Sequence, residues 1–148
     1  MSINVKVLNH LEYITVLNQV TNRLVVFEKV FSEYVKTAKH IITGRALVDE
    51  NLPSLQKRFY KNLQVLKHFS RLVIEIPVEN DCLELKKNLN NAFQQYISTT
   101  IDLYRVINQD NLENYQTIMS YRKNQKFQAI QISQVISSGA ELSQDKAI

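Results

Sequence analysis

The 148-residue sequence contains very little glycine, proline and cysteine, and it has no tryptophan. Its two glycines are Gly44 and Gly139, and its two prolines are Pro53 and Pro77. This scarcity argues against an all-β fold, because such folds need many tight turns, in which glycine and proline predominate. It also argues against glycine-rich phosphate-binding loops, which need several glycines in close succession.

The single cysteine and the absence of long apolar runs bear on where the protein resides. Cys82 cannot form an intramolecular disulfide bond, and it is compatible with a reducing compartment. Because no run of about 18 apolar residues occurs, we expect no membrane-spanning helix. The first eleven residues include Lys6 and His10 and lack a cleavage signature, so we expect no secretory signal and a cytoplasmic protein.

A long first helix is the clearest feature of the sequence. Its apolar residues recur every three or four positions over residues 17–41, which predicts an amphipathic helix. They are Leu17, Val20, Leu24, Phe27, Phe31, Tyr34, Ala38 and Ile41. Further apolar residues flank this seam, and the wide face favours burial against two neighbouring helices. Asn9 with Glu12 forms a capping-box pair that predicts a start near His10, and Gly44 is placed to end the helix.

A second helix is predicted to begin near residues 52–54, with Pro53 in its first turn. It should stop before Pro77, because proline disfavours helical geometry at the preceding residue and lacks a backbone donor. Its expected buried face consists of Leu52, Leu55, Phe59, Leu63, Leu66, Phe69 and Val73.

A third helix is predicted from a second capping-box pair, Asp81 with Glu84. Thr99 and Thr100 interrupt its apolar face, and we expect a buried threonine there to return its hydroxyl hydrogen bond to the preceding turn. The expected apolar face consists of Cys82, Leu85, Leu89, Ala92, Phe93, Tyr96, Ile97, Leu103, Val106 and Ile107.

A fourth helix has the weakest pattern. The pair Asp110 and Glu113 predicts its start, and Gly139 is placed to end it. A polar run over residues 120–126 separates its apolar residues into two groups. This polar middle does not match a continuous apolar core.

These elements predict an all-α protein, an antiparallel four-helix bundle with a long first helix. A minor alternative adds a two-strand element formed by residues 3–7 and residues 72–78, which contain many β-branched residues. We expect one bundle domain over residues 1–139 and a flexible C-terminal tail over residues 140–148.

Candidates for catalysis and metal binding are few. None of His10, His40 and His68 follows an acidic residue at the Glu-x-x-His spacing of helical di-iron sites. Cys82 has acidic neighbours, which oppose thiolate formation, so we interpret it as a small buried residue. The acidic residues fall at predicted caps or on polar faces. We therefore expect no enzyme, no metal and no cofactor.

A basic stripe on the second helix is the first candidate binding site. No acidic residue occurs between Glu50 and Glu75, and helical geometry gathers the basic residues toward one side. Such a stripe is typical of contact with nucleic acid, an anionic membrane surface or an acidic protein. The alternative is a solvated face that pairs with acidic residues of neighbouring helices. The stripe consists of Lys57, Arg58, Lys61, Lys67, His68 and Arg71.

A second basic and aromatic patch lies in the fourth helix. Positive charge beside aromatic rings is compatible with single-stranded nucleic acid, although no RNA-binding or zinc-binding motif accompanies it. The two patches would act together only if the fold placed them on one side. The patch consists of Tyr121, Arg122, Lys123, Lys126 and Phe127.

The fourth helix also favours a docking role. Its mismatched pattern leaves Tyr115, Met119 and Phe127 available to another chain's helix, unless this helix simply packs at the periphery.

Three functional hypotheses follow. The first is a non-enzymatic interaction module, acting as an adaptor, an accessory subunit or a small inhibitor with a protein partner or as a homo-oligomer. The second is a nucleic-acid-binding accessory protein that uses the basic stripe. The third, an enzyme or small-ligand sensor, would require a cavity where polar groups such as Asn62, Thr99 and Thr100 converge.

Overall fold

Four long α-helices follow one another along the chain in the computed structural model, which describes residues 6–108 and 115–147 and the side chains as far as Glu141. No strand occurs among these residues, and the prediction of an all-α protein is confirmed. The helices are α1 (His10–Ile42), α2 (Leu52–Ile74), α3 (Leu83–Ile107) and α4 (Tyr115–Ala147), with a short 3₁₀ turn, η1 (Asn80–Cys82), before α3.

Both ends of α1 form as the sequence predicts. The Asn9 side chain accepts a hydrogen bond from the Glu12 backbone N–H at 2.9 Å, and the Glu12 carboxylate accepts one from the Asn9 N–H at 3.2 Å. This reciprocal pair is the predicted capping box. After α1, Gly44 adopts a φ of 70°, a left-handed conformation that glycine tolerates and that lets the chain leave the helix.

The boundaries of α2 are also confirmed. The Asn51 side chain accepts a hydrogen bond from the Ser54 N–H at 2.9 Å, and Pro53 lies in the first turn, where a missing donor costs nothing. The helix ends at Ile74, ahead of Pro77.

The capping box predicted for α3 is wrong. Residues 80–82 form the 3₁₀ turn η1, and no side-chain hydrogen bond caps α3. Its N-cap residue, Cys82, has helical dihedral angles and is fully buried, as expected of a small residue on the apolar face. The chain therefore passes from η1 directly into α3, and its backbone does not take the extended geometry that a capping side chain needs.

The predicted end of α4 at Gly139 is wrong as well, because the helix continues through this residue to Ala147. A Cβ atom at Gly139 would lie 2.7 Å from Leu85 of α3, so glycine here permits a close approach of two helices. Residues 140–147, predicted as a tail, have a helical backbone. The predicted start of α4 at Asp110 and Glu113 lies outside the described residues.

The two-strand alternative reduces to one isolated bridge. The Leu8 N–H donates to the Pro77 carbonyl oxygen, and the Glu79 N–H donates to the Leu8 carbonyl oxygen, each at 3.0 Å. Residues 72–74, which the alternative placed in a strand, belong to α2, and residues 3–5 lie outside the described part. The bridge fastens the segment before α1 to the connection between α2 and α3.

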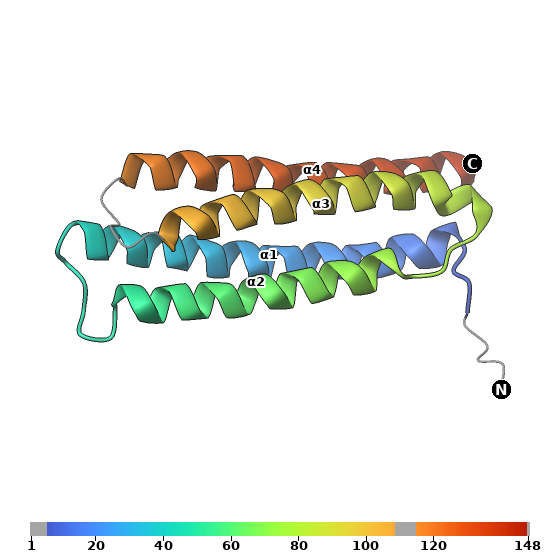
Figure 1. Ribbon diagram of the computed structural model, residues 1–148. Helices are drawn as coiled ribbons and strands as arrows, with labels where there is room; N and C mark the ends of the chain where they lie inside the picture. The colour runs from blue at the N-terminus through green and yellow to red at the C-terminus, as the bar shows by residue number, and fades with distance from the viewer. Residues whose placement is uncertain (1–5, 109–114, 148) are drawn as a thin grey trace, which may run out of the picture.

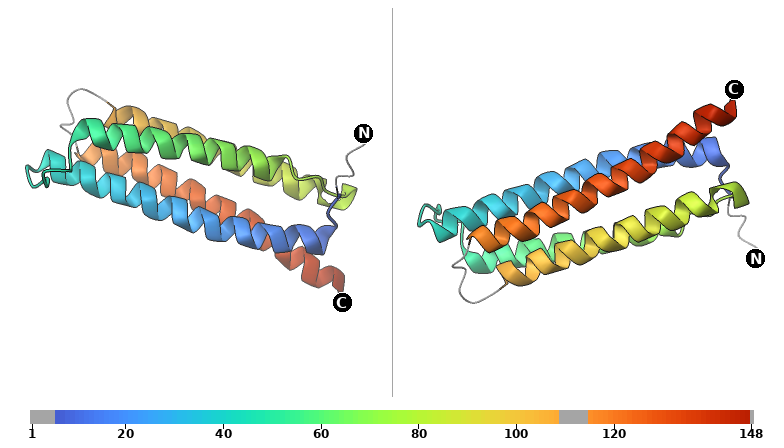
Figure 2. Two further views of the ribbon diagram at one scale, coloured as in Figure 1. Left: turned by 90° about the horizontal axis from the view of Figure 1, so that it is seen from below. Right: turned by 90° about the horizontal axis from the view of Figure 1, so that it is seen from above.

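The helices pack side by side in alternating directions (Figures 1 and 2). α1 packs against α2 and α4, and α3 packs against the same two helices. α1 and α3 are therefore one diagonal pair of the bundle, and α2 and α4 are the other. This arrangement is an antiparallel four-helix bundle with up-down-up-down connections.

The core runs along the inward faces of all four helices. The predicted seam of α1 forms part of it, with Tyr34 and Ile41 half-buried at its end and the remaining residues buried. The largest fully buried side chains are Tyr13, Leu17, Phe31, Phe59, Leu66, Leu89, Phe93, Tyr96, Leu103, Ile107, Ile118 and Ile132.

Candidate functional site

The predicted basic stripe lies on the outside of α2. Five of its six side chains are exposed and Lys67 is half-buried. None of its lysines and arginines forms an ion pair with an acidic residue in the described part of the chain. The alternative interpretation requires ion pairs between the stripe and acidic residues of neighbouring helices. The described residues contain no such ion pair. The stripe consists of Lys57, Arg58, Lys61, Lys67, His68 and Arg71.

The second predicted patch does not form one surface. Tyr121 is half-buried against the core, and Arg122 is drawn into the bundle by Glu28. Lys123, Lys126 and Phe127 are exposed. The patch also belongs to α4, which lies diagonally across the bundle from α2. The two basic regions are therefore on different sides of the molecule.

A buried polar network connects α4 to the rest of the bundle. Arg122 Nη1 donates to Glu28 Oε2 of α1 and to Gln125 Oε1, in each case at 2.6 Å. Gln125 Nε2 donates to the Thr100 hydroxyl of α3 at 2.9 Å, and Tyr96 of α3 donates its hydroxyl hydrogen to Glu28 Oε2 at 3.1 Å. Three helices thus meet at one ion pair and its hydrogen-bond partners.

The electrostatics of this network follow from its burial. The side chains of Arg122 and Glu28 are 12% and 19% exposed, so water screens their charges weakly. Burial, together with the adjacent Glu28 carboxylate, raises the pKa of the Tyr96 hydroxyl far above its usual value, because both disfavour a phenolate. Tyr96 therefore remains a hydrogen-bond donor to Glu28 throughout the physiological range.

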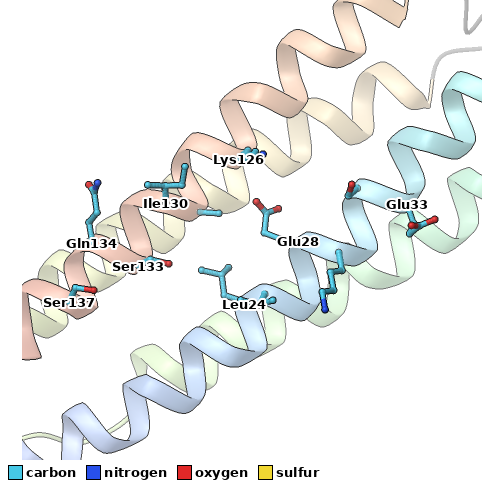
Figure 3. A pocket seen from close by; sticks show the side chains of 12 residues that line it. Leu24, Glu28, Glu33, Lys126, Ile130, Ser133, Gln134 and Ser137 are labelled. Atoms are coloured by element: carbon cyan, nitrogen blue, oxygen red, sulfur yellow. The ribbon is translucent and has the colours of Figure 1, made fainter.

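An open groove lies between α1 and α4, and the two charged residues of this network, Glu28 and Arg122, are among the residues that line it. Its first half has a volume of about 610 Å³. Polar and charged side chains such as Glu33 and Ser133 line it together with apolar ones (Figure 3), and the apolar side chains supply most of its exposed surface. Leu24 and Val25 line it from α1, and Ala129 and Ile130 line it from α4. Val25 and Ile130 are 50% and 46% exposed, so the two helices do not close over their own apolar side chains. We call this part the apolar half of the groove.

The second half of the groove, about 780 Å³ in volume, is strongly basic. Lys36 and Lys39 of α1 face it together with Lys123 and Lys126 of α4, and all four are exposed. The Lys39 ammonium lies over the Tyr115 ring, 5.5 Å from its centroid, which is within the range of a cation–π contact. We call this part the lysine half of the groove.

Sequence reasoning missed most of the groove. It named Lys123 and Lys126 in the basic patch and Met119 and Tyr115 as docking residues, and all four line the lysine half. It did not name Lys36 or Val25, and it assigned Leu24 only to the buried seam of the first helix. The polar run of residues 120–126 was the available indication, because it predicted a poor match between the fourth helix and a continuous core.

The polar groups proposed for an enzyme pocket do not converge. Both threonine hydroxyls donate to the Tyr96 carbonyl oxygen, at 2.9 Å for Thr99 and 2.8 Å for Thr100, which confirms the predicted bond to the preceding turn. The Asn62 side chain instead donates to the Tyr34 hydroxyl and to the backbone of α2. These three residues therefore serve separate local contacts.

The described histidines and acidic residues assemble no metal centre. No group of three or more His, Cys, Asp or Glu residues in the described part could hold a metal ion. His40 Nδ1 lies 2.8 Å from Glu50 Oε2, and the other Glu50 oxygen accepts the Leu47 N–H at 3.0 Å. The histidine and the Leu47 N–H lower the pKa of Glu50, because both favour the carboxylate. This clip fixes the connection between α1 and α2.

Comparison with known proteins finds no match: no family model, no curated protein and no solved structure is significantly similar to this chain. Among the described residues, no helix has the length and apolar character needed to cross a membrane.

Proposed function

We propose that this protein acts through protein–protein contact, as an adaptor, an accessory subunit or a small inhibitor, and that a partner binds in the groove between α1 and α4. The proposed role is non-enzymatic. The observation that carries it is the open groove that half-exposed Val25 and Ile130 line from two different helices. Apolar surface in a concave site favours binding of another apolar surface, because both leave water on contact.

The apolar residues that line the groove differ in their surroundings from exposed apolar residues on α2. Leu72 and Val65 are 53% and 40% exposed on α2, but neither lines a described groove. Scattered apolar residues of this kind are normal on protein surfaces. Met119, at 42% exposure, extends the apolar lining into the lysine half.

The test compares two matched substitutions. Ile130→Asp places a charge in the apolar half of the groove, and Leu72→Asp places the same charge on an exposed apolar residue of α2. Purified wild-type protein and both variants are incubated with native lysate, and the bound proteins are identified by mass spectrometry. We expect a partner that wild type and Leu72→Asp retain and Ile130→Asp loses. A partner retained equally by all three proteins, or no partner with a monomeric wild type in sedimentation, would contradict the proposal.

A second candidate, nucleic-acid binding through the α2 stripe, is favoured by the exposure of its basic residues and by their lack of ion pairs with described acidic residues. The test is titration with single-stranded and duplex oligonucleotides at low salt. Lys61→Glu with Arg71→Glu should abolish binding, whereas Lys123→Glu with Lys126→Glu, an equal change of charge on α4, should preserve it. Binding should weaken steeply with added salt, because protein contacts displace counterions. No association of the wild type at low salt would remove this candidate.

A further inference from the structure

Resting on the proposed function, we infer that the occupant of the groove is an amphipathic helix of a partner protein, with acidic side chains along the part that meets the lysine half. The inference depends on the shape of the groove, its apolar lining and its concentration of positive charge. Each of these restricts the chemistry of the occupant.

The two halves form one continuous groove of helical dimensions. Ser32 and Lys126 line both halves, so the two halves adjoin along the same pair of helices. Along α1 the lining extends from Leu24 to Lys39. At a rise of 1.5 Å per residue this stretch is about 22 Å long, which equals about four turns of an α-helix. A partner helix of that length can lie along both halves at once.

The apolar half favours a helix with an apolar stripe. Leu24 and Ala129 form its buried floor, and Val25 and Ile130 flank it with about half of each side chain exposed. Side chains recurring every three or four residues on a partner helix would fill the space between α1 and α4, as in helix-in-groove recognition.

The lysine half requires negative charge from its occupant. Lys36, Lys39, Lys123 and Lys126 have no ion-pair partner among the described acidic residues. Like charges that share one groove repel each other, and an occupant that carried further positive charge or only apolar groups would have to desolvate them without compensation.

Within residues 6–108 and 115–141, whose side chains the structure describes, the acidic groups around this half do not neutralise it. Glu28 is held by Arg122, so these two charges compensate each other. Glu33 is exposed and lines the apolar half. Glu50 is paired with His40, and its pKa shows only a minor influence of Lys36. Glutamate or aspartate from a partner would therefore supply the missing counter-charge.

The experiment selects binders to the folded full-length chain from a displayed library of amphipathic helices. The apolar positions of the library are fixed at helical spacing, and the polar positions are randomised. We expect the selected sequences to be enriched in Glu and Asp over one end of the helix. Binding to Ile130→Asp identifies which selected peptides occupy the groove, because this substitution should abolish their binding.

Matched charge reversals then test the lysine half. Lys36→Glu with Lys123→Glu should weaken an acidic selected peptide by about tenfold or more, because it places like charges against each other. Lys57→Glu with Lys61→Glu makes the same change on α2 and should leave the affinity within about twofold. Far-UV circular dichroism confirms that each variant retains the fold.

The outcomes separate this inference from the proposed function. One outcome is that selected peptides bind wild type and not Ile130→Asp yet show no enrichment in Glu and Asp. That result would overturn the inference of an acidic partner, and the proposal that the groove is a docking site would stand. Peptides insensitive to Ile130→Asp, or no binders at all, would contradict docking in the groove itself. Acidic peptides unaffected by the reversal of Lys36 and Lys123 would show that their charges lie elsewhere and would also overturn the inference.

Discussion

The two sides of α1 are held to the bundle by different chemistry. Toward α2, aromatic rings pack against one another: Phe31 and Phe59 lie 5.1 Å apart, and Phe27 and Phe69 lie 5.6 Å apart, measured between centroids. Phe59 also contacts Tyr104 of α3 at 5.5 Å. Such rings bury large apolar areas and gain from their tilted geometry. The α2 side is therefore a largely apolar seam, with the hydrogen bonds of the Tyr34 hydroxyl with Asn62 and with the Arg58 carbonyl oxygen at one place along it.

Toward α4, a charged pair occupies the corresponding place. Glu28 and Arg122 join α1 to α4, and Gln125, which is fully buried, joins α4 to Thr100 of α3. The same two helices leave an open groove, which Glu28 and Arg122 help to line. Apolar packing tolerates small shifts in register, whereas a hydrogen-bonded ion pair is strong only in one arrangement. Burial therefore holds both helices, through residues such as Ile118 and Ile132 on α4, and α4 has in addition a buried ion pair and hydrogen bonds that specify its position.

The largest expected effect on stability comes from a substitution in the apolar packing between α1 and α2. Phe59→Ala should lower the free energy of unfolding by about 4 kcal/mol, because it removes a fully buried ring and leaves a cavity between three helices. Phe127→Ala, at a ring on α4 that is 56% exposed, should change it by less than about 0.5 kcal/mol. Urea unfolding followed by circular dichroism measures both. Equal effects would contradict the apolar seam.

The next largest expected effect on stability comes from a substitution in the ion pair between α1 and α4. Glu28→Gln keeps the shape of the side chain but removes the counter-charge of Arg122. We expect it to lower the free energy of unfolding by about 3 kcal/mol. Glu33→Gln, on the exposed side of the same helix, should have almost no effect. Replacing both members of the pair, Glu28→Met with Arg122→Met, should recover most of the loss, since it removes both buried charges. A double variant less stable than the single one would mean that α4 requires the pair.

A smaller effect distinguishes two buried tyrosines. Tyr96→Phe should lower the free energy of unfolding by about 1 kcal/mol, because it removes the hydroxyl group that donates a hydrogen bond to Glu28. The Tyr13 hydroxyl is buried with no hydrogen-bond partner among the described residues, and its burial raises its pKa to about 12. Tyr13→Phe should therefore leave stability unchanged or raise it. Denaturant unfolding of the two variants side by side makes the comparison, and a larger loss for Tyr13→Phe would contradict it.

The smallest effect concerns pH and the clip between α1 and α2. The folded-state pKa of Glu50 is lowered, so its carboxylate contributes stability above its usual pKa, and this contribution is lost as the pH falls through the lowered value. The melting temperature of Glu50→Gln should therefore approach that of wild type as the pH decreases from neutral to about 3. A difference in melting temperature that stays constant with pH would mean that ionisation of Glu50 does not matter.

Much of the helical architecture could be predicted from neighbouring residues. The seam of α1 and the Asn9–Glu12 cap depend on side chains three or four positions apart, and such contacts form within a single helix. The cap predicted for α3 from Asp81 and Glu84 failed because the same letters also fit a 3₁₀ turn. Gly139 failed as a helix end because its role depends on Leu85 of another helix.

The candidate site could be predicted only in part. Lys123 and Lys126 were recognised as basic residues, but Arg122 was placed with them, although Glu28 draws it into the bundle. The pattern of α4 showed a mismatch without showing its cause. Gln125 forms a hydrogen bond with Thr100, and Arg122 forms an ion pair with Glu28. The partners in each pair are far apart in the sequence, so a local pattern cannot predict these contacts.

Local sequence patterns are sufficient to predict four amphipathic helices, the beginning and end of α1 and α2, and the residues of α1 that face inward. These features follow from contacts within one or two turns. The tertiary structure decided which polar residues are buried, that the two basic regions lie on diagonal helices, and that lysines of α1 and α4 share one groove. The physical reason is that these features depend on which helices become neighbours, and that choice is made by packing between segments far apart in the chain.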